Sequence, residues 1–439
     1  MRRNFELRME TAELYKIYQA HPVITTDSRD CPEGSIFIAL KGVSFNGNKF
    51  ALDALKKGCA YAVVDEAEYA TDKRCILVDD CLETYKMLAR HHRRMFSIPV
   101  IGITGTNGKT TTKELVAAVL GEKYNVLYTQ ANFNNDVGVP KTLLRIRPEH
   151  EIAVIEMGAS HPGDIKTLVE TVEPDFGLIT NVGRAHLLGF GSFEGVIKTK
   201  GELYDFLRMR ADSEVFIDAD NRYLAGIANG LKLIRYGVNE QEDLDVRGEV
   251  ISCAPFLKFR WKSCDAEWYT VQTHLIGSYN IANMLAAITI GRRFGVNAKT
   301  ICKALEGYKP SNNRSQLEVT EHNKLIVDAY NANPTSMMAA LTNFRDMEVS
   351  PKMAILGSMG ELGGVSTEEH QKIVDFIVGN YIDNVWLVGE EFEKINCSLR
   401  KFHDVEQVKE AIKKEQPQGY YILIKGSNSQ KLYQLLECL

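Results

Sequence analysis

Several hallmarks of common protein classes are missing from this sequence of 439 residues. No uncharged apolar run reaches about 18 residues, so no membrane-spanning helix is expected. Arg2 and Arg3 are followed by further charged residues rather than by an apolar segment, so a secretory signal is not expected either. The net charge of −5 has the wrong sign for a polyanion binder, which makes nucleic acid a poor partner. We expect a cytoplasmic protein.

Cysteine pairs are also lacking. The nine cysteines are an odd number, and no two of them form a C-x-x-C pair. Scattered reduced thiols in a cytosolic protein explain this pattern better than a zinc site or a disulfide framework. With 45% hydrophobic and 25% charged residues, the composition is that of an ordinary globular protein. The length suggests about three domains, and a monomer is expected.

The most informative stretch runs from Ile98 to Glu114 and reads IPVIGITGTNGKTTTKE. A short run rich in β-branched residues passes into a glycine-rich turn, and a run of good helix formers follows. In such a unit the N–H groups of the turn, the helix N-terminus and the lysine all face one anion, which predicts a nucleotide phosphate site. The Thr110 hydroxyl would contact a phosphate-bound Mg²⁺. The residues assigned to the nucleotide are Gly105, Thr106, Asn107, Gly108, Lys109, Thr110 and Thr111.

Two comparisons limit this prediction. The strict G-x-x-x-x-G-K-[ST] template needs glycine at position 103, where Ile103 stands, so the turn is a variant P-loop. Its glycines at 102, 105 and 108 also fail the G-x-G-x-x-G fingerprint, which disfavours a dehydrogenase. The alternative is a glycine-rich turn with an incidental lysine.

Strand and helix patterns divide the chain into three predicted domains. Residues 1–97 hold short mixed elements and end in an amphipathic helix over 80–96. Residues 98–310 alternate strands and helices, with an antiparallel excursion at 244–276. Residues 311–439 repeat the alternation, with helices beginning near Pro334, Thr367, Val405 and Ser429. The predicted fold is α/β: a small mixed N-terminal domain, a central mostly parallel P-loop sheet with helices on both faces, and a C-terminal doubly wound (Rossmann-like) domain.

Polar residues follow several predicted strands, at the sheet edge where such folds bind ligands. Glu156 ends the strand 152–156 and is the best candidate for an oxygen ligand of a nucleotide-bound Mg²⁺. His186, Lys198 and Lys200 lie beyond the next strand, but on spacing alone a structural histidine and a solvated helix face explain them better than a metal site does. The loops VDAYNANPTSM, LGSMGELG and ILIKGSNSQ predict an edge of the last sheet that closes over the nucleotide. These features indicate an ATP enzyme with a site shared between domains, but they do not identify the acceptor.

At GITGTNGKTTTKE the chain resembles the Mur ligase family of ATP-dependent, amide-forming enzymes, over essentially its whole length. The resemblance implies that ATP phosphorylates a substrate carboxylate and that an incoming amine attacks the acyl phosphate. Within the family, seven ordered blocks are similar to those of members that join D-alanyl-D-alanine to UDP-N-acetylmuramoyl-tripeptide in peptidoglycan synthesis. The blocks are TDSRDCPEGSIFIALKG, NFNNDVGVP, IEMGAS, ITNVGRAHL, VDAYNANPTSM, GSMGELG and IKGS.

The resemblance also implies catalytic and metal roles. Lys109 would stabilise phosphoryl oxygens, while Thr110 and Glu156 would hold a first Mg²⁺. His186 becomes a ligand of a second Mg²⁺. Lys200, preferred by its position in K-G-E, would be carbamylated and so become a carboxylate-like ligand. The implied catalytic residues are Lys109, Lys200 and His186.

Other positions match family contacts to the nucleotide and to the two substrates. The first domain would bind the UDP-sugar, the central domain ATP, and the third domain would close over ATP and bind the dipeptide. The implied nucleotide contacts are Asn280, Arg314, Asp328, Asn331 and Asn333. The implied substrate contacts are Ser28, Arg29, Lys41, Asn134, Asn135, Lys425 and Ser427.

The chain departs from the family pattern at a few of these places. Tyr279 stands where histidine is common, which affects the packing of adenine, and Asn46 and Asn48 lie in a replaced Asp-Gly-His segment near the uridine. Asn313 and Asn428 replace a common glycine and arginine. None of these departures touches the P-loop or the metal residues.

Three alternatives stay open on the sequence. The first is a Mur-type ligase that adds a single amino acid. The second is a folylpolyglutamate synthase-like ligase, although those enzymes begin near the P-loop and this chain has about 97 residues before it. The third is a P-loop kinase or regulatory ATPase, which would form no amide.

Overall fold

The computed structural model describes residues 9–240, 243–253, 255–263, 267–310, 314–380, 382 and 384–439. The chain forms two compact units. Unit 1 contains Met1–Gly102, Leu127–Met157 and Lys166–Pro174, and unit 2 contains Ile103–Val126, Gly158–Ile165 and Asp175–Leu439. Among the described residues, no helix is long and apolar enough to cross a membrane.

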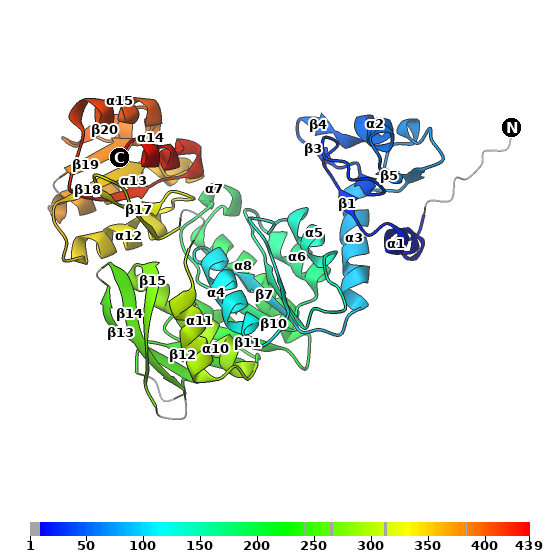
Figure 1. Cartoon of the computed structure of the whole chain (residues 1–439), viewed down its shortest axis with the longest axis horizontal. Helices are drawn as coiled ribbons and strands as arrows, with labels where there is room; N and C mark the ends of the chain where they lie inside the picture. Colours follow the sequence, from blue (N-terminus) through cyan, green and yellow to red (C-terminus); the bar gives the residue numbers. More distant parts are fainter. Residues whose placement is uncertain are drawn as a thin grey trace. The chain divides into compact units, whose positions relative to one another are not determined.

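Unit 1 begins with a small parallel sheet, β1-β2-β5-β6, flanked by helices. The blue segments of Figure 1 show these elements. In chain order they are α1 (Thr11–Ala20), β1 (Ile24–Thr25), β2 (Ile36–Ile38), β3 (Lys41–Gly42), β4 (Phe45–Asn46), η1 (Gly47–Phe50), α2 (Ala51–Lys56), β5 (Tyr61–Val64), η2 (Ala67–Tyr69), β6 (Cys75–Leu77) and α3 (Cys81–Arg94).

Helix α3 joins this small sheet to the rest of unit 1. Its N-cap is Asp80, whose carboxylate accepts the Glu83 N–H at 2.7 Å. His92 on its buried face contacts the Ile146 carbonyl at 2.9 Å, and the Tyr18 hydroxyl donates to the Leu144 carbonyl at 2.6 Å. Buried polar side chains therefore connect α1 and α3 to the segment after α5 (Gly138–Leu143).

The central strands belong partly to each unit. The start of β7 (Val100–Thr104), β9 (Ile152–Glu156) and most of β8 (Val126–Tyr128) lie in unit 1 in the order β7-β9-β8. Helix α6 (Asp164–Val172) also crosses the division. In unit 2, the end of β7 is followed in the sheet by β10, β11, β12, β13, β14 and β15.

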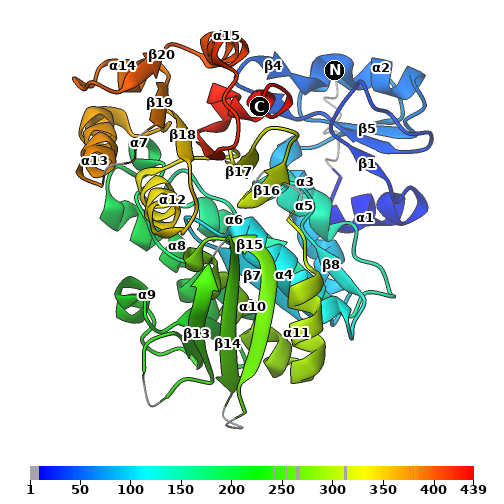
Figure 2. The same cartoon turned by 60° about the vertical axis from the view of Figure 1, so that its left-hand side comes forward.

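The unit 2 part of this sheet is parallel from β10 to β13 and antiparallel from β13 to β15. Figure 2 shows the antiparallel strands side by side, with α10 and α11 near them. The elements are α4 (Lys109–Gly121), β10 (Phe176–Ile179), α7 (Leu187–Phe190), α8 (Phe193–Arg208), β11 (Glu214–Asp218), α9 (Arg222–Ile227), β12 (Leu233–Gly237), β13 (Val246–Cys253), β14 (Phe256–Ser263), β15 (Tyr269–Ile276), η3 (Ser278–Asn280), α10 (Ile281–Arg293) and α11 (Ala298–Gly307).

Two neighbouring residues of β10 show that helices cover both faces of this sheet. Adjacent side chains in a strand point to opposite faces. The ring of Phe176 packs against Phe294, directly after α10, whereas a Cβ on Gly177 would meet Leu203 and Leu207 of α8. Helices α10 and α8 therefore lie on opposite faces.

The last part of unit 2 is a six-stranded sheet in the order β16-β17-β21-β18-β19-β20. All its pairs are parallel except β16 with β17. The elements are β16 (Gln316–Val319), β17 (Lys324–Asp328), α12 (Pro334–Asp346), β18 (Lys352–Gly357), η4 (Gly363–Val365), α13 (Ser366–Gly379), β19 (Asn384–Val388), α14 (Glu390–Glu393), β20 (Arg400–Phe402), α15 (Val405–Glu415), β21 (Tyr421–Lys425), η5 (Asn428–Gln430) and η6 (Leu432–Glu437).

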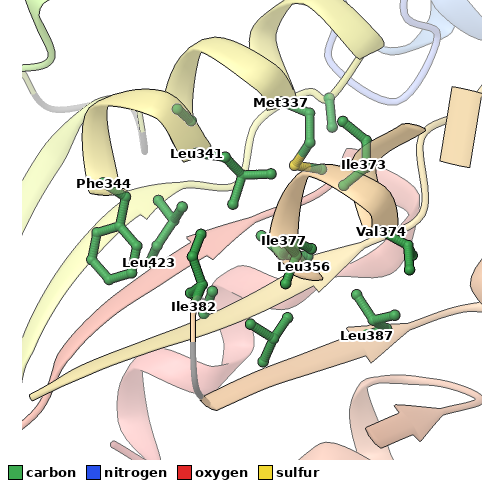
Figure 3. Packing of buried hydrophobic residues seen from close by; sticks show 14 of the residues in the cluster. Met337, Leu341, Phe344, Leu356, Ile373, Val374, Ile377, Ile382, Leu387 and Leu423 are labelled. Atoms are coloured by element: carbon green, nitrogen blue, oxygen red, sulfur yellow. The ribbon is translucent and has the colours of Figure 1, made fainter. Parts of the chain in front are cut away.

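Alternate strand residues of this sheet feed two separate cores. Leu356 and Leu423 pack with α12 and α13, while their neighbours Ile355 and Ile422 pack with α15 and η6. Helices on both faces make the domain doubly wound. Figure 3 shows the first core, with Met337, Leu341, Phe344, Leu356, Ile373, Val374, Ile377, Ile382, Leu387 and Leu423 labelled.

The predicted fold class is confirmed: this is a three-domain α/β protein with parallel-dominant sheets. One element was predicted wrongly. The helix expected from Ser429 is replaced by the short 3₁₀ helices η5 and η6, because Lys431 between them has a left-handed φ of 53°. Strand β16 was not predicted. The boundaries at 97/98 and 310/311 stay predictions, and Asn313 and the second boundary fall at residues 311–313, outside the described part.

Candidate nucleotide and ligase site

The turn after β7 adopts a backbone that only glycine takes without strain. Gly105 and Gly108 have φ values of +141° and +77°. A Cβ on Gly105 would collide with Thr180, and one on Gly108 would lie 2.6 Å from Asn283 Oδ1. The turn therefore needs glycine both for its shape and for its close neighbours.

Residues after β10 hold this turn from outside. The Asn107 N–H donates to Asn181 Oδ1 at 3.0 Å, and the Thr180 hydroxyl donates to the Asn107 carbonyl at 2.6 Å. Lys109 reaches back over the turn, where its Nζ donates to the Gly105 carbonyl at 2.7 Å and the Thr106 carbonyl at 2.9 Å. The Lys109 ammonium therefore lies at the turn that opens α4, as the predicted anion site requires, and the binding of an anion there stays a prediction.

A second layer of amides supports the first turn of α4. Asn283 Oδ1 accepts from the Thr112 hydroxyl at 3.0 Å, and its Nδ2 donates to Asn280 Oδ1 at 2.8 Å. Asn280 is 3% exposed and donates to the Ile276 carbonyl at 2.8 Å. Asn283 was missed from the sequence. The repeat of asparagine three residues apart in N-I-A-N, on one helix face, is the signal that could have identified it.

His186 lies in the loop between β10 and α8, next to the P-loop. Gly183 in this loop donates its N–H to the Thr106 hydroxyl at 2.9 Å. His186 has a left-handed φ of 51°, which is uncommon outside glycine. Burial lowers the pKa of His186, the Glu361 carboxylate opposes this, and Lys109 and Lys200 lower it further. The structure therefore brings His186, Lys109 and Lys200 within electrostatic range.

Lys200 is a buried cation. It lies in α8, whose N-cap Ser192 accepts the Gly195 N–H at 3.0 Å. The residue is 2% exposed, and its Nζ makes a long contact of 3.5 Å with the Ala159 carbonyl. Burial, followed by the charge of Lys109, lowers the pKa of Lys200 well below its ordinary value. Lys198, the sequence alternative, is exposed.

In the C-terminal sheet, β17, β21 and β18 are adjacent and parallel, so their carboxyl ends share one edge. At this edge, Lys425 is 1% exposed and its Nζ lies 2.5 Å from Asp328 Oδ2 and 3.4 Å from the Asn331 carbonyl. The Ser427 hydroxyl accepts the Gly360 N–H at 2.9 Å. The structure therefore brings the three predicted polar loops together.

This edge contacts the P-loop through Asn333. Its Nδ2 donates to Asn107 Oδ1 at 2.8 Å, and its Oδ1 caps α12 by accepting the Ser336 N–H at 2.9 Å. Arg314 stacks on Tyr330 at 3.9 Å from the ring centre, and within the described residues its buried Nε has no hydrogen-bond partner. A cavity of about 480 Å³ lies beside Asn280, and it is lined by Ser278, Tyr279, Thr335, Met338, Ala339, Thr342 and Asn343.

Within unit 1, two predicted residues contact each other. Asn134 donates its Nδ2 to Glu156 Oε1 at 2.8 Å, at the carboxyl end of β9. Asn135 Oδ1 accepts the Gly138 N–H at 2.8 Å and the Val137 N–H at 3.3 Å, in the turn that leads into α5. The Asn135 side chain therefore closes the local turn before α5.

The predicted uridine residues lie beside the small sheet of unit 1, in the loop between β1 and β2 and in β3. Arg29 pairs with Asp27 at 2.8 Å, and the Ser28 carbonyl accepts from Lys57 at 2.7 Å. Lys41 lies 3.0 Å from Asp65. The arginine holds the pKa of the Asp27 carboxyl well below its usual range.

The replaced segment near the uridine residues is part of one network with Lys41. Asn48 is 1% exposed and donates to Asp65 at 2.8 Å, while Asn46 donates to Glu66 at 3.0 Å. The two asparagines therefore tie this turn to the end of β5, next to Lys41.

The metal question depends on the donor set. Among the described residues, no group of three His, Cys, Asp or Glu side chains is arranged to hold an ion. The predicted ligands in unit 2 are the Thr110 hydroxyl, the His186 imidazole and Lys200, whose pKa is lowered. This set fits Mg²⁺ only when phosphate and carbamate oxygens complete it.

A glycine turn with a lysine, opening a helix after a strand of an α/β sheet, defines a P-loop nucleotide-binding enzyme. Three family models match the chain: the Mur ligase family catalytic domain at residues 22–93, the Mur ligase middle domain at 103–291, and the Mur ligase glutamate ligase domain at 313–428. The chain belongs to the Mur ligase family, which confirms the resemblance seen in the motifs.

The chain is similar over nearly its whole length to a curated ligase and to solved MurF structures. The UDP-N-acetylmuramoyl-tripeptide–D-alanyl-D-alanine ligase of Bacillus subtilis is 33% identical over 95% of this chain and 92% of the relative. A crystal structure of MurF from Acinetobacter baumannii has a TM-score of 0.86 at 28% identity, covering 96% of this chain and 97% of that one. MurF from Thermotoga maritima in complex with ADP has a TM-score of 0.85 at 27% identity, covering 95% and 96%.

Proposed function

We propose that this protein is an ATP-dependent ligase that joins D-alanyl-D-alanine to UDP-N-acetylmuramoyl-tripeptide in the cytoplasm. The observation that carries the proposal is the match, over almost the full length of both chains, to relatives with that name. ADP in the similar Thermotoga maritima structure supports nucleotide use. Of the sequence alternatives, a phosphoryl-transfer enzyme without amide formation is the least supported.

The reaction needs cations beside the phosphoryl group. A carboxylate oxygen of the tripeptide attacks the γ-phosphorus of ATP, and ADP leaves. The dipeptide amine then attacks the acyl carbon, loses a proton and expels phosphate. Lys109, at the opening of α4, would bind the phosphoryl oxygens in both steps. Asn280, Arg314, Asp328, Asn331 and Asn333 would position the nucleotide.

Magnesium would draw charge from the phosphoryl oxygens when bound. We assign Thr110 and Glu156 to a first ion, and His186 and Lys200 to a second. Lys200 suits carbamylation because its lowered pKa leaves a neutral amine. The amine nitrogen would attack CO₂, form an N–C bond and release a proton, which leaves an anionic oxygen ligand.

The substrate residues are assigned by position. Ser28, Arg29 and Lys41 would hold the uridine diphosphate, with Asn134 and Asn135 along the peptide path. Lys425 and Ser427 would act at the C-terminal edge. The Lys425–Asp328 ion pair supports an indirect role for Lys425, since its ammonium already has an anionic partner.

The test is phosphate release with ATP, Mg²⁺, the UDP-muramoyl-tripeptide and the dipeptide, together with the mass of the product. We expect turnover only when all four are present, and a product heavier by the dipeptide minus one water. Release without the dipeptide, or a stable phosphorylated product, contradicts the proposal. Single amino acids and a folate substrate, offered in place of the native pair, test the two ligase alternatives.

Carbamylation has its own test. Lys200→Ala should lose activity, and ¹³C-bicarbonate should give a carbamate NMR signal in the parent that this variant lacks. Lys198→Ala is the matched control, because that lysine is exposed on the same helix. A carbamate signal that persists in Lys200→Ala and disappears in Lys198→Ala would place the modification on Lys198 and contradict the assignment to Lys200.

A further inference from the structure

The Glu361 side chain makes an unexpected contact with a proposed metal ligand. Its Oε2 contacts Nδ1 of His186, although the residues are far apart in sequence and lie in different predicted domains. Neutral imidazole has one N–H, and a carboxylate beside Nδ1 favours the tautomer that carries the proton on Nδ1. The other ring nitrogen, Nε2, is then the one with a lone pair available for a metal.

Hydrogen bonds of two backbone N–H groups fix the loop that carries Glu361. The Met359 N–H donates to His370 Nε2 at 3.0 Å, and the Gly360 N–H donates to the Ser427 hydroxyl at 2.9 Å. Glu361 itself has a left-handed φ of 62°, a conformation that costs a non-glycine residue about 1 kcal/mol or more. Strain of this kind persists where surrounding contacts impose it, and it is common at functional sites.

The His186 loop docks on the same segment. The Leu188 N–H donates to the Glu361 carbonyl at 3.2 Å, and a Cβ on Gly363 would lie 3.1 Å from Leu188. Val365 packs against the small cluster of Leu187, Phe190 and Val196. Contacts of the loop backbone thus place Glu361 next to His186, while the Glu361 side chain is itself 62% exposed.

We propose that Glu361 is a positioning residue that orients the imidazole of His186, so that Nε2 faces the second Mg²⁺. Ligating histidines in proteins usually donate their other N–H to a carboxylate or carbonyl, which fixes the tautomer and ring orientation. Here that carboxylate comes from the C-terminal domain. The orientation of this ligand therefore depends on docking of the Glu361 loop. The inference rests on the proposed role of His186.

The first experiment needs neither metal nor substrate. ¹⁵N NMR of the histidine side chains reports the tautomer of His186, which should be Nδ1–H in the parent. Glu361→Ala should shift it toward the Nε2–H form that free imidazole prefers, and Glu361→Gln should keep it, because the amide oxygen still accepts. An unchanged tautomer in Glu361→Ala overturns the proposal, whatever the enzyme's substrates are.

The second experiment measures Mn²⁺ binding by electron paramagnetic resonance, with a non-hydrolysable ATP analogue on the full chain. Glu361→Ala should weaken binding at the second site about 10-fold to 100-fold, as loss of such a partner typically does. Glu361→Gln should stay within about threefold of the parent.

Glu369→Ala is the matched control for domain docking. The Glu369 carboxylate lies 3.8 Å from Arg184, in the loop that carries His186, and contacts the loop at a different residue from Glu361. It should leave Mn²⁺ affinity unchanged. An equal loss in Glu369→Ala and Glu361→Ala would mean that docking alone matters and would overturn the positioning role. If the parent bound no second Mn²⁺, the proposed metal site would fail while the tautomer result stood.

Discussion

Replacing Gly108 by alanine tests the phosphate site most directly. The residue has φ +77°, where an L-side chain costs about 1–2 kcal/mol, and its new Cβ would lie 2.6 Å from Asn283 Oδ1. The variant can relieve the backbone strain and the close contact if the turn relaxes. Nucleotide binding must then restore the strained conformation, which weakens the affinity. A penalty of about 1–2 kcal/mol corresponds to about a 5-fold to 30-fold rise in the Kd for ADP.

Isothermal titration calorimetry with ADP and Mg²⁺ measures this change. The matched control is Gly121→Ala, at the end of the same helix, where no atom lies within 4 Å of the new Cβ. It should stabilise the protein by about 0.5–1 kcal/mol and leave the Kd unaltered. A Gly108→Ala Kd within twofold of the parent would refute the assignment of this turn to the phosphates.

Three further substitutions give separate tests. Lys109→Ala should lower kcat about a thousandfold in the phosphate-release assay, and near-normal turnover would contradict its role. Lys425→Ala leaves Asp328 without its cation and should destabilise the protein by about 3–5 kcal/mol in urea, whereas a loss below about 1 kcal/mol would argue against a buried pair. Burial raises the pKa of Asp218 to about 6, so its contribution to stability is complete below about pH 4 and lost as pH rises through 6. Asp218→Asn should therefore have a free energy of unfolding in urea up to about 3 kcal/mol higher than the parent at pH 7. The two free energies should converge near pH 4.

Local sequence signals were enough for much of this fold. The strand Ile152–Glu156 matches its predicted bounds, and helices begin at the predicted Pro334 and Val405, because apolar runs between turn residues have few other solutions. The prediction of the final helix was wrong for a local reason as well. Lys431 has a left-handed backbone that interrupts the helix, and no proline or glycine marks this in the sequence. Strand β16 is short and half-buried, so its pattern is weak.

The site was predictable in its glycine turn and less so in its supports. Lys109 follows directly from G-K-T, but the roles of Asn181, Asn283 and Glu361 depend on contacts between distant segments. Nothing in G-E-L-G alone shows that its carboxylate meets a histidine. The structure distinguishes the two lysines because Lys200 is buried and Lys198 is exposed. The sequence alone does not give the burial of a side chain.

The amide layer under α4 has a consequence for synthesis on the ribosome. Thr112 and its partner Asn283 are 171 residues apart. At about 5–20 residues per second, translation takes roughly 9 to 34 s to produce the second after the first. During that interval the glycine turn lacks the support of Asn283. The turn therefore gains its full set of supports only after Asn283 has been made, and ATP that binds the supported turn stabilises the completed fold.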